Sequence, residues 1–207
     1  LDSLLDPRAF SGHGAIVMRA DQLILWDAGT QSFLNLALHV DGTNKAWKLF
    51  DRFEEEGYGY TNPVLPSGSA LWFRSSTTDV GKVSVSGEVV MDAAVTNAIR
   101  PGLQLLSNPF SDEVRLGDLS IHVNATAHRF NVNVADQIVL WDAGTQSFLT
   151  LVLNVSGTNK AWKLFDGFEV EGVGYTNPVI RPGQGFWFRA RNAFDWVETN
   201  KYVDGLE

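Results

Sequence analysis

Apolar and polar residues alternate along two segments of this chain. Leu34, Leu36, Leu38 and Val40 are separated by Asn, Ala and His, and the same spacing of apolar residues recurs over residues 149–155. Successive side chains of a strand point to opposite faces of a sheet. A period of two therefore predicts two strands, each with one face turned towards a core.

A short continuous apolar run precedes each alternating segment. The runs are Leu-Ile-Leu-Trp at residues 23–26 and Ile-Val-Leu-Trp at residues 138–141, and we expect strands that are buried on both faces. Asp-Ala-Gly-Thr-Gln follows each run, at residues 27–31 and 142–146. Asp and Gly are typical of tight turns, so each run and the segment after it are predicted to form a hairpin.

Further strands are predicted along the rest of the chain at intervals of roughly 8 to 12 residues. They cover residues 45–50, 71–74 and 83–89, and copies of the first two cover 160–165 and 186–189. No stretch shows a sustained helical period, and short helices are expected only near residues 1–10 and 116–121.

The recurrence of these patterns reflects a tandem duplication. Residues 21–74 align without a gap to residues 136–189 at an offset of about 115, and about 39 of the 54 aligned positions are identical. A period near 100 residues is the size of a domain. The sequence therefore predicts an all-β fold of two tandem homologous β-sandwich or barrel-like units.

The two predicted units differ in how much of the repeat they contain. Residues 83–115 precede the second copy, and nothing before Leu1 corresponds to them, so the first unit is predicted to lack its opening strands. We expect a first, incomplete unit over residues 1–80 and a second, complete unit over 81–195. Residues 196–207 are left as a C-terminal tail.

An incomplete sheet exposes unpaired backbone N–H and C=O groups, which favours the addition of another strand. We expect residues 194–207 to supply that strand, with apolar anchors at Trp196, Val197, Tyr202 and Val203. The tail either folds back within its own chain or enters the first unit of a neighbouring chain. The second route joins unlike surfaces, so it would build a head-to-tail polymer.

Composition narrows the classes of function. Hydrophobic residues make up 44% of the 207 residues and aromatic residues 12%, enough for sizeable cores. The net charge of −8 disfavours unspecific binding to nucleic acid or to an anionic membrane. No apolar run approaches the roughly 18 residues of a membrane span. The chain starts with Leu, so we expect a processed terminus, although a trimmed chain would begin in the same way.

Aromatic residues recur at equivalent positions of the two copies. Because large aromatic side chains dominate small β cores, we expect most of them to pack in the interior. Aromatic rings on a sheet face can instead stack against sugars, and that alternative stays open. The predicted core tryptophans of the repeat are Trp26, Trp47, Trp72, Trp141, Trp162 and Trp187.

Carboxylates also recur as pairs. Asp27 with Asp51, and Asp142 with Asp166, could act as acid and base or as calcium ligands. We prefer a structural role, because Asp27 and Asp142 occupy turn positions and no calcium-binding spacing is present. Cysteine is absent, and the histidines form no metal-binding motif. We therefore expect no catalytic residues and no cofactor, with calcium as the remaining possibility.

Three motifs carry a resemblance to a known group of proteins. Pro-Gly-Leu-Gln-Leu-Leu-Ser-Asn-Pro-Phe at 101–110 is followed by Trp-Asp-Ala-Gly-Thr-Gln-Ser-Phe at 141–148 and Pro-Gly-Gln-Gly-Phe-Trp-Phe at 182–188. Together they resemble a β module of uncharacterised secreted and surface-associated bacterial proteins. The resemblance implies an exported, non-catalytic, repeat-built surface protein. The first copy departs from it at residues 66–71 and has no counterpart of the first motif.

The expected function is that of a non-catalytic structural protein at the cell surface or outside the cell. Its subunits would assemble into a filament or layer by β-strand complementation, so the expected partner is the chain itself. The alternative is a carbohydrate-binding module of a secreted protein, with a surface glycan as its ligand.

Overall fold

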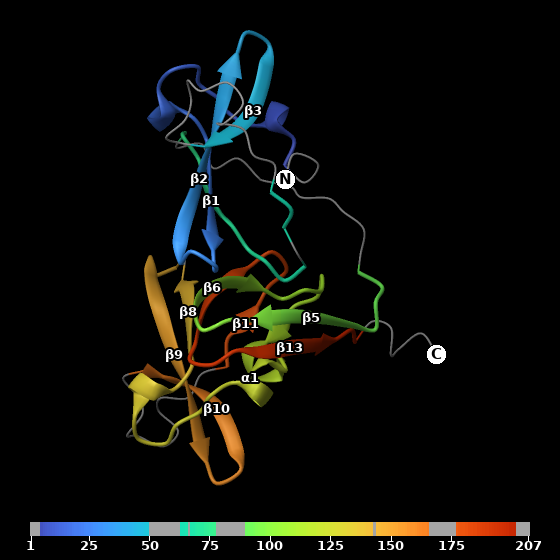
Figure 1. Ribbon diagram of the computed structural model, residues 1–207, viewed down its shortest axis with the longest axis vertical. Helices are drawn as coiled ribbons and strands as arrows, with labels where there is room; N and C mark the ends of the chain where they lie inside the picture. Colours follow the sequence, from blue (N-terminus) through green and yellow to red (C-terminus); the bar gives the residue numbers. More distant parts are fainter. Residues whose placement is uncertain are drawn as a thin grey trace. The chain divides into compact units, whose positions relative to one another are not determined.

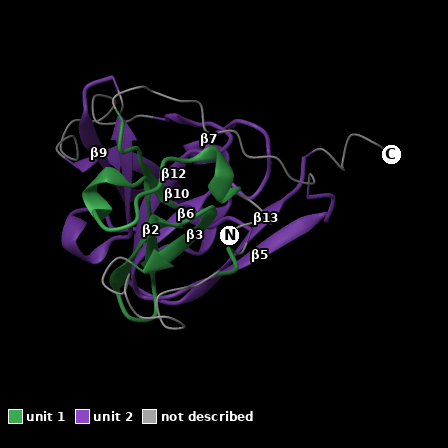
Figure 2. Ribbon diagram, turned by 90° about the horizontal axis from the view of Figure 1, so that it is seen from above, with its two compact units in different colours: residues 1–66, 71–88 green, residues 67–70, 89–207 purple. Residues whose placement is uncertain are grey.

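The computed structural model describes residues 5–49, 63–65, 67–77, 90–142, 144–165 and 177–201, and these form an all-β fold of antiparallel sheets, as predicted (Figure 1). The chain divides into two compact units, coloured separately in Figure 2. The first unit comprises residues 1–66 and 71–88, and the second comprises residues 67–70 and 89–207.

The first unit is built on one four-stranded sheet with the strand order β3-β2-β1-β4. Two 3₁₀ turns, η1 (Pro7–Ala9) and η2 (Val17–Arg19), precede it. Its strands are β1 (Gln22–Asp27), β2 (Ser32–Asp41), β3 (Asn44–Leu49) and β4 (Trp72–Arg74).

The second unit contains a five-stranded sheet with the order β10-β9-β8-β12-β6 and two ribbons, β11-β7 and β13-β5. The sheet consists of β6 (Gly102–Ser107), β8 (Gln137–Asp142), β9 (Ser147–Ser156), β10 (Asn159–Leu164) and β12 (Gly185–Ala190). The ribbons consist of β5 (Ala94–Ile99), β7 (Val114–Arg115), β11 (Val179–Ile180) and β13 (Phe194–Thr199). The helical turns are η3 (Leu116–Asp118), α1 (Ile121–Asn124) and η4 (Val132–Val134).

The duplicated sequence produces the same hairpin twice, and we call positions 115 residues apart equivalent. Trp26 pairs with Phe33 across the first hairpin, and Trp141 pairs with Phe148 across the second. The aspartate that opens each turn, Asp27 or Asp142, accepts a hydrogen bond from the N–H of the glycine two residues later, at 2.8 Å in both copies. The predicted role of these aspartates in the turns is confirmed.

Each unit has its own hydrophobic core on one face of its sheet. Alternate residues of β1 and β2 fill the first core, which contains Leu23, Leu25, Leu36, Leu38 and Trp47. The second core holds their equivalents and also side chains of the β13-β5 ribbon. The Trp196 ring lies 6.4 Å from that of Phe186, and the Phe194 ring lies 6.0 Å from that of Phe188. The ribbon therefore packs on the sheet as the second layer of a sandwich-like unit.

Only two of the six repeated tryptophans belong to these cores. Trp47 and Trp162 are buried, with 0% and 2% of their surfaces exposed. Trp26, Trp72, Trp141 and Trp187 are partly exposed, contrary to expectation. Their neighbours in sequence point into the core, so alternation turns these four rings to the opposite face. The predicted burial of residues 23–26 and 138–141 on both faces is wrong for the same reason.

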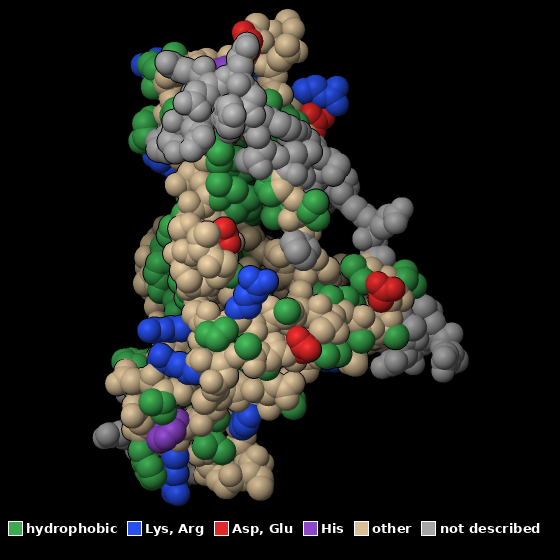
Figure 3. Space-filling model, viewed as in Figure 1, with side chains coloured by type: hydrophobic (Ala, Val, Ile, Leu, Met, Phe, Trp, Pro, Cys, Tyr) green, Lys and Arg blue, Asp and Glu red, His purple; other side chains and the backbone are tan. Residues whose placement is uncertain are grey.

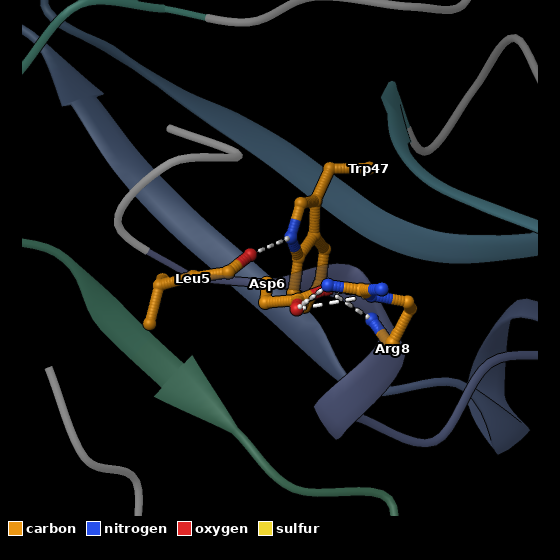
Figure 4. A network of polar contacts seen from close by, with 4 residues as sticks. All are labelled: Leu5, Asp6, Arg8 and Trp47. Carbon is orange, nitrogen blue, oxygen red and sulfur yellow. Dashed lines mark hydrogen bonds and ion pairs between the residues drawn. The ribbon is translucent and has the colours of Figure 1, made fainter.

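The two buried tryptophans differ in their hydrogen bonding. Trp47 donates a hydrogen bond from Nε1 to the carbonyl oxygen of Leu5 at 3.3 Å (Figure 4). The residue after Leu5, Asp6, forms an exposed ion pair with Arg8, and this contact lowers the pKa of Asp6 to about 2. Ser120 is the residue equivalent to Leu5, and its carbonyl accepts the N–H of Val123 in α1. Within the described ranges, Nε1 of Trp162 has no hydrogen-bond partner.

The unit boundaries differ from the expected ones. The main division falls between residues 88 and 89 rather than near residue 80, and residues 67–70 belong to the second unit. Residues 196–199 are part of β13, so they are not a separate tail. The strand predicted over residues 83–89 lies outside the described part of the chain.

We predict that Trp162→Ala and Trp141→Ala have unequal effects. Trp162 fills the core, so its truncation should lower the free energy of unfolding of the second unit by about 3 to 5 kcal/mol. Trp141 is partly exposed and contacts Phe148 edge-on at 4.9 Å, so its truncation should cost only about 1 to 2 kcal/mol. Urea unfolding followed by near-ultraviolet circular dichroism measures both values. Equal losses would contradict the assignment of Trp141 to the outer face.

Candidate functional site: an open sheet edge

The two sheets differ at one side. In the second unit β12 lies between β8 and β6, whereas its equivalent in the first unit, β4, is the last strand of the sheet. The residues 187–189 of β12 are Trp-Phe-Arg, and β4 has the same three residues. No equivalent of β6 occurs among the described residues of the first unit. Among the described residues, the edge of β4 is therefore the position at which the first sheet has no further strand.

The direction in which the backbone N–H and C=O groups of β4 point follows from a hydrogen bond of Ser76, two residues after the strand. The N–H of Ser76 donates a hydrogen bond at 2.7 Å to Oδ1 of Asp21, the residue directly before β1. Antiparallel strands direct successive residues alternately to their two neighbours. Arg74 and Trp72 therefore face β1, and the N–H and C=O of Phe73 face the open edge. The equivalent bond, from the N–H of Arg191 to Asp136 Oδ1 at 2.6 Å, orients Phe188 towards β6.

Side chains at this edge are less covered than their equivalents. Phe186 and Phe188 in β12 expose 1% and 0% of their surfaces, whereas Leu71 and Phe73 are only partly buried. Positions far from the edge show no such contrast, since Leu36 and its equivalent Leu151 are both fully buried. The difference in burial is therefore confined to this side of the sheet, where the second unit adds both β6 and the ribbon residues Trp196 and Phe194.

A buried aspartate fastens β4 to β1. Asp21 is 5% exposed. Its Oδ2 accepts the N–H of Ser11 at 2.8 Å, and its Oδ1 accepts both the N–H and the hydroxyl of Ser76. The carboxylate thus ties together three segments that meet at one end of the sheet. It holds β4 in place, and among the described residues β4 pairs with β1 alone.

The same arrangement recurs in the second unit, and we call it the aspartate clasp: a buried aspartate before the first strand that accepts backbone N–H groups from two other segments. Asp136 is fully buried, and it accepts the N–H groups of Thr126 at 2.8 Å and Arg191 at 2.6 Å. Burial raises the pKa of the Asp136 carboxyl, and the two backbone donors and the charges of Arg191 and Lys160 oppose that rise. Sequence analysis missed both aspartates. The available signal was an identical Asp directly before the first strand of each copy.

The second unit shows how the outer edge of β6 is covered. The N–H of Ser107 donates to the carbonyl of Gly68 at 2.7 Å, and its hydroxyl donates to the carbonyl of Ser69 at 3.0 Å. Gly68 has a φ of 80°, which permits the sharp turn that presents both carbonyls. β6 is therefore paired with β12 on one side and partly capped by residues 67–70 on the other.

Residues 194–199 form β13, but they do not pair with a first unit. They pair with β5 in the second unit, from Phe194 opposite Ile99 to Thr199 opposite Ala94. Figure 1 shows the two strands side by side. The donor role of the tail stays a prediction, and six of its residues already have a strand partner within their own unit. Tyr202 and Val203 lie outside the described residues.

The burial of alternate β13 side chains explains this pairing. Trp196 is 1% exposed, and its Nε1 donates to Glu198 Oε2 at 2.8 Å. The same oxygen accepts the N–H of Ser120 at 2.8 Å, and the Ser120 hydroxyl also donates to the carbonyl of Val197. Val197, on the opposite face, is 44% exposed. The predicted tail anchor Trp196 thus finds its pocket within its own unit.

The residues considered for catalysis or metal binding are occupied by structural contacts. Across the described ranges no three His, Cys, Asp or Glu residues converge on a point that could hold a metal ion. On the face seen in Figure 3 the acidic side chains stand singly. Asp51 and Asp166 lie outside the described residues. The Thr145 hydroxyl and the Gly144 N–H lower the pKa of Asp142.

The two aligned histidines also have structural partners. His13 Nδ1 accepts the N–H of Ile16 at 2.8 Å, and His128 Nδ1 accepts the N–H of Asn131 at 2.9 Å. Each ring nitrogen closes the turn that follows its histidine. This use of the ring nitrogen explains why both copies carry a histidine here without a neighbouring metal ligand.

Comparisons with known proteins assign neither a family nor a function to the chain. No family model, no curated protein and no solved structure matches the chain. Among the helices of the described segments, none is long and apolar enough to cross a membrane. The functional argument consequently rests on the open edge of β4 and on its comparison with β12.

We predict that Asp136 makes the second unit less stable as the pH rises. Below the ordinary pKa of 3.8 the carboxyl is protonated in both states. Above 3.8 the unfolded chain ionises first, because burial raises the pKa in the folded state, so stability is lost as the pH rises through the folded pKa. Asp136→Asn cannot titrate. Unfolding in urea over a pH series should show the wild type losing stability relative to Asp136→Asn between pH 3.8 and neutrality.

The opposite slope would contradict this account. If the wild type gained stability relative to Asp136→Asn as the pH rose, the two backbone donors would outweigh the desolvation of the carboxylate. A titration of the Asp136 carboxyl by carbon-13 NMR provides an independent reading of the same pKa.

Proposed function

We propose that this chain is a non-catalytic structural protein that acts at the cell surface or outside the cell and assembles with further copies by β-strand complementation at β4. One observation carries the proposal. The first sheet ends at β4, whereas the equivalent strand β12 is followed by β6. Within the described residues the same strand is therefore found with a further neighbour in the second unit and without one in the first.

Strand addition at this edge has a direct physical basis. Phe73 directs its N–H and C=O to the side where the second unit holds β6, and backbone pairing there supplies affinity. The partly buried side chains of Leu71 and Phe73 supply apolar surface that an added strand would cover. A donor surface and an acceptor surface that differ can repeat from subunit to subunit, so assembly need not close into a ring.

The non-catalytic role is supported by the structural partners of the two buried aspartates and of the two equivalent histidines. Asp21, Asp136, His13 and His128 accept backbone hydrogen bonds that fasten strands and turns. Placement outside the cell is supported by the resemblance of the three repeat motifs to secreted and surface-associated proteins. The net charge of −8 suits a soluble surface exposed to solvent.

Carbohydrate binding is the second candidate function, and it has its own observation. Phe33 and Phe148 are 54% and 53% exposed at the tips of the two identical hairpins, each edge-on to a tryptophan. Aromatic side chains at the same place in both units could contact a repeating sugar. Retention on polysaccharide affinity gels, lost in the double variant Phe33→Ala and Phe148→Ala, would support this function.

We predict that the chain forms concentration-dependent polymers and that Leu71→Pro abolishes them. Leu71 precedes β4 by one residue. If the strand alternation continues to it, as at the equivalent Phe186 in β12, its N–H faces the same edge as that of Phe73, and proline lacks this donor. Leu71→Ala is the matched control, because it removes the same side chain but keeps the N–H. Sedimentation velocity over a concentration series, with negative-stain microscopy of the largest species, measures the outcome.

The comparison of the two variants decides the interpretation. We expect Leu71→Ala to retain polymers and Leu71→Pro to sediment as a folded monomer. Wild-type protein that remains a monomer at all concentrations would sink the assembly proposal. Unchanged polymers from Leu71→Pro would show that growth uses another surface.

A further inference from the structure

We infer that the strand accepted by β4 is of the β6 type, an extended and uncharged segment with the pattern Gly-Leu-Gln-Leu-Leu-Ser, supplied by a separate repeat unit. The inference rests on the proposed function, since it names the partner of the same edge. In this chain β6 is itself paired with β12, so a further copy donates its β6 only by exchanging it from β12 to the β4 of its neighbour. The inference also replaces the C-terminal tail as the donor, because residues 194–199 of that tail are paired with β5.

The second unit defines the register of such a complex. In β12, Trp187 lies opposite Leu105, Phe188 opposite Gln104 and Arg189 opposite Leu103. β4 carries the same Trp-Phe-Arg sequence and pairs with β1 as β12 pairs with β8. A donor strand on β4 would therefore place its Gln104 position opposite Phe73, and its Leu106 position opposite Leu71.

The backbone of the donor has two sides with different roles. In β6, the N–H of Ser107 points away from β12, because it donates to the carbonyl of Gly68. By alternation Leu105 and Leu103 also point away, whereas Leu106 and Gln104 point towards β12. In the proposed complex the N–H groups at the Leu106 and Gln104 positions would bind β4, and those at the Leu105 and Leu103 positions would not.

The side chains of β6 match the acceptor. Leu106 is 8% exposed and belongs to the same core as Phe186 and Phe188. A leucine at this place in the first unit would cover Leu71 and Phe73, the two equivalents that are only partly buried. On the core side β6 presents Leu106 and the uncharged Gln104, and β6 contributes no charge that would need a partner.

The one large polar side chain of β6 is satisfied by its own segment. Gln104 is 5% exposed, its Nε2 donates to the carbonyl of Arg100 at 2.9 Å, and its Oε1 accepts the N–H of Arg100 at 3.3 Å. A donor strand therefore carries the partners of its glutamine with it, provided that it includes the Arg100 position. The shortest donor that meets this condition spans residues 100–107.

A peptide of residues 100–109 tests the inference on the full chain, at a concentration where the chain is monomeric. Calorimetry measures its affinity, and NMR shifts of the Leu71 and Phe73 amides locate it. N-methylation at Gln104 and Leu106 of the peptide should weaken binding by about tenfold or more, because it removes both donors to β4. N-methylation at Leu103 and Leu105, the matched control, should weaken it by less than about threefold.

The remaining outcomes separate this inference from the proposed function. If the chain polymerises but the peptide neither binds β4 nor inhibits growth, the β6-type donor is wrong and assembly stands. If the peptide binds with the expected N-methyl pattern but the chain never polymerises, the donor is correct and assembly fails. A peptide of residues 200–207 that occupies β4 more tightly than residues 100–109 would overturn the inference in favour of the tail.

Discussion

The alternation of backbone hydrogen bonds in antiparallel strands is the constraint on which this structure depends. Each strand directs its N–H and C=O groups in turn to two neighbours, so a strand with one neighbour leaves half of these groups for water or for another chain. The carboxylates of Asp21 and Asp136 set that alternation at equivalent places, since each accepts an N–H just beyond the strand that it orients. The direction in which Phe73 faces follows from the clasp.

The duplication turns this constraint into an internal comparison. β4 and β12 share their sequence and their pairing on one side, and they differ in whether another strand follows. The two strands can therefore be compared within one molecule: Phe188 is fully buried, whereas its equivalent Phe73 is partly exposed. The second unit covers Phe188 both with β6 beside it and with the β13-β5 ribbon above it, and the described part of the first unit has neither.

The hairpins could be predicted from the sequence, because period-two patterns, Asp-Gly turns and the repeat offset are local signals. The pairing of β13 with β5 could not, since it joins residues about 100 positions apart and depends on the pocket for Trp196. The partly exposed Trp141 was mistaken for a core residue, because composition alone does not show which face of a strand is covered. Asp21 was overlooked because a single buried carboxylate has no spacing motif, and its partners Ser11 and Ser76 are distant in sequence.

Amide hydrogen exchange at Phe73 and Phe188, followed in one sample of the monomeric chain, tests the central claim most directly. The two residues share their local sequence, and each serves as the reference for the other. The account predicts that the Phe188 amide, bonded within the sheet, exchanges at least about 100-fold more slowly than the Phe73 amide at the open edge. Equal protection of the two amides in the monomer would show that β4 is already paired, and it would contradict the account.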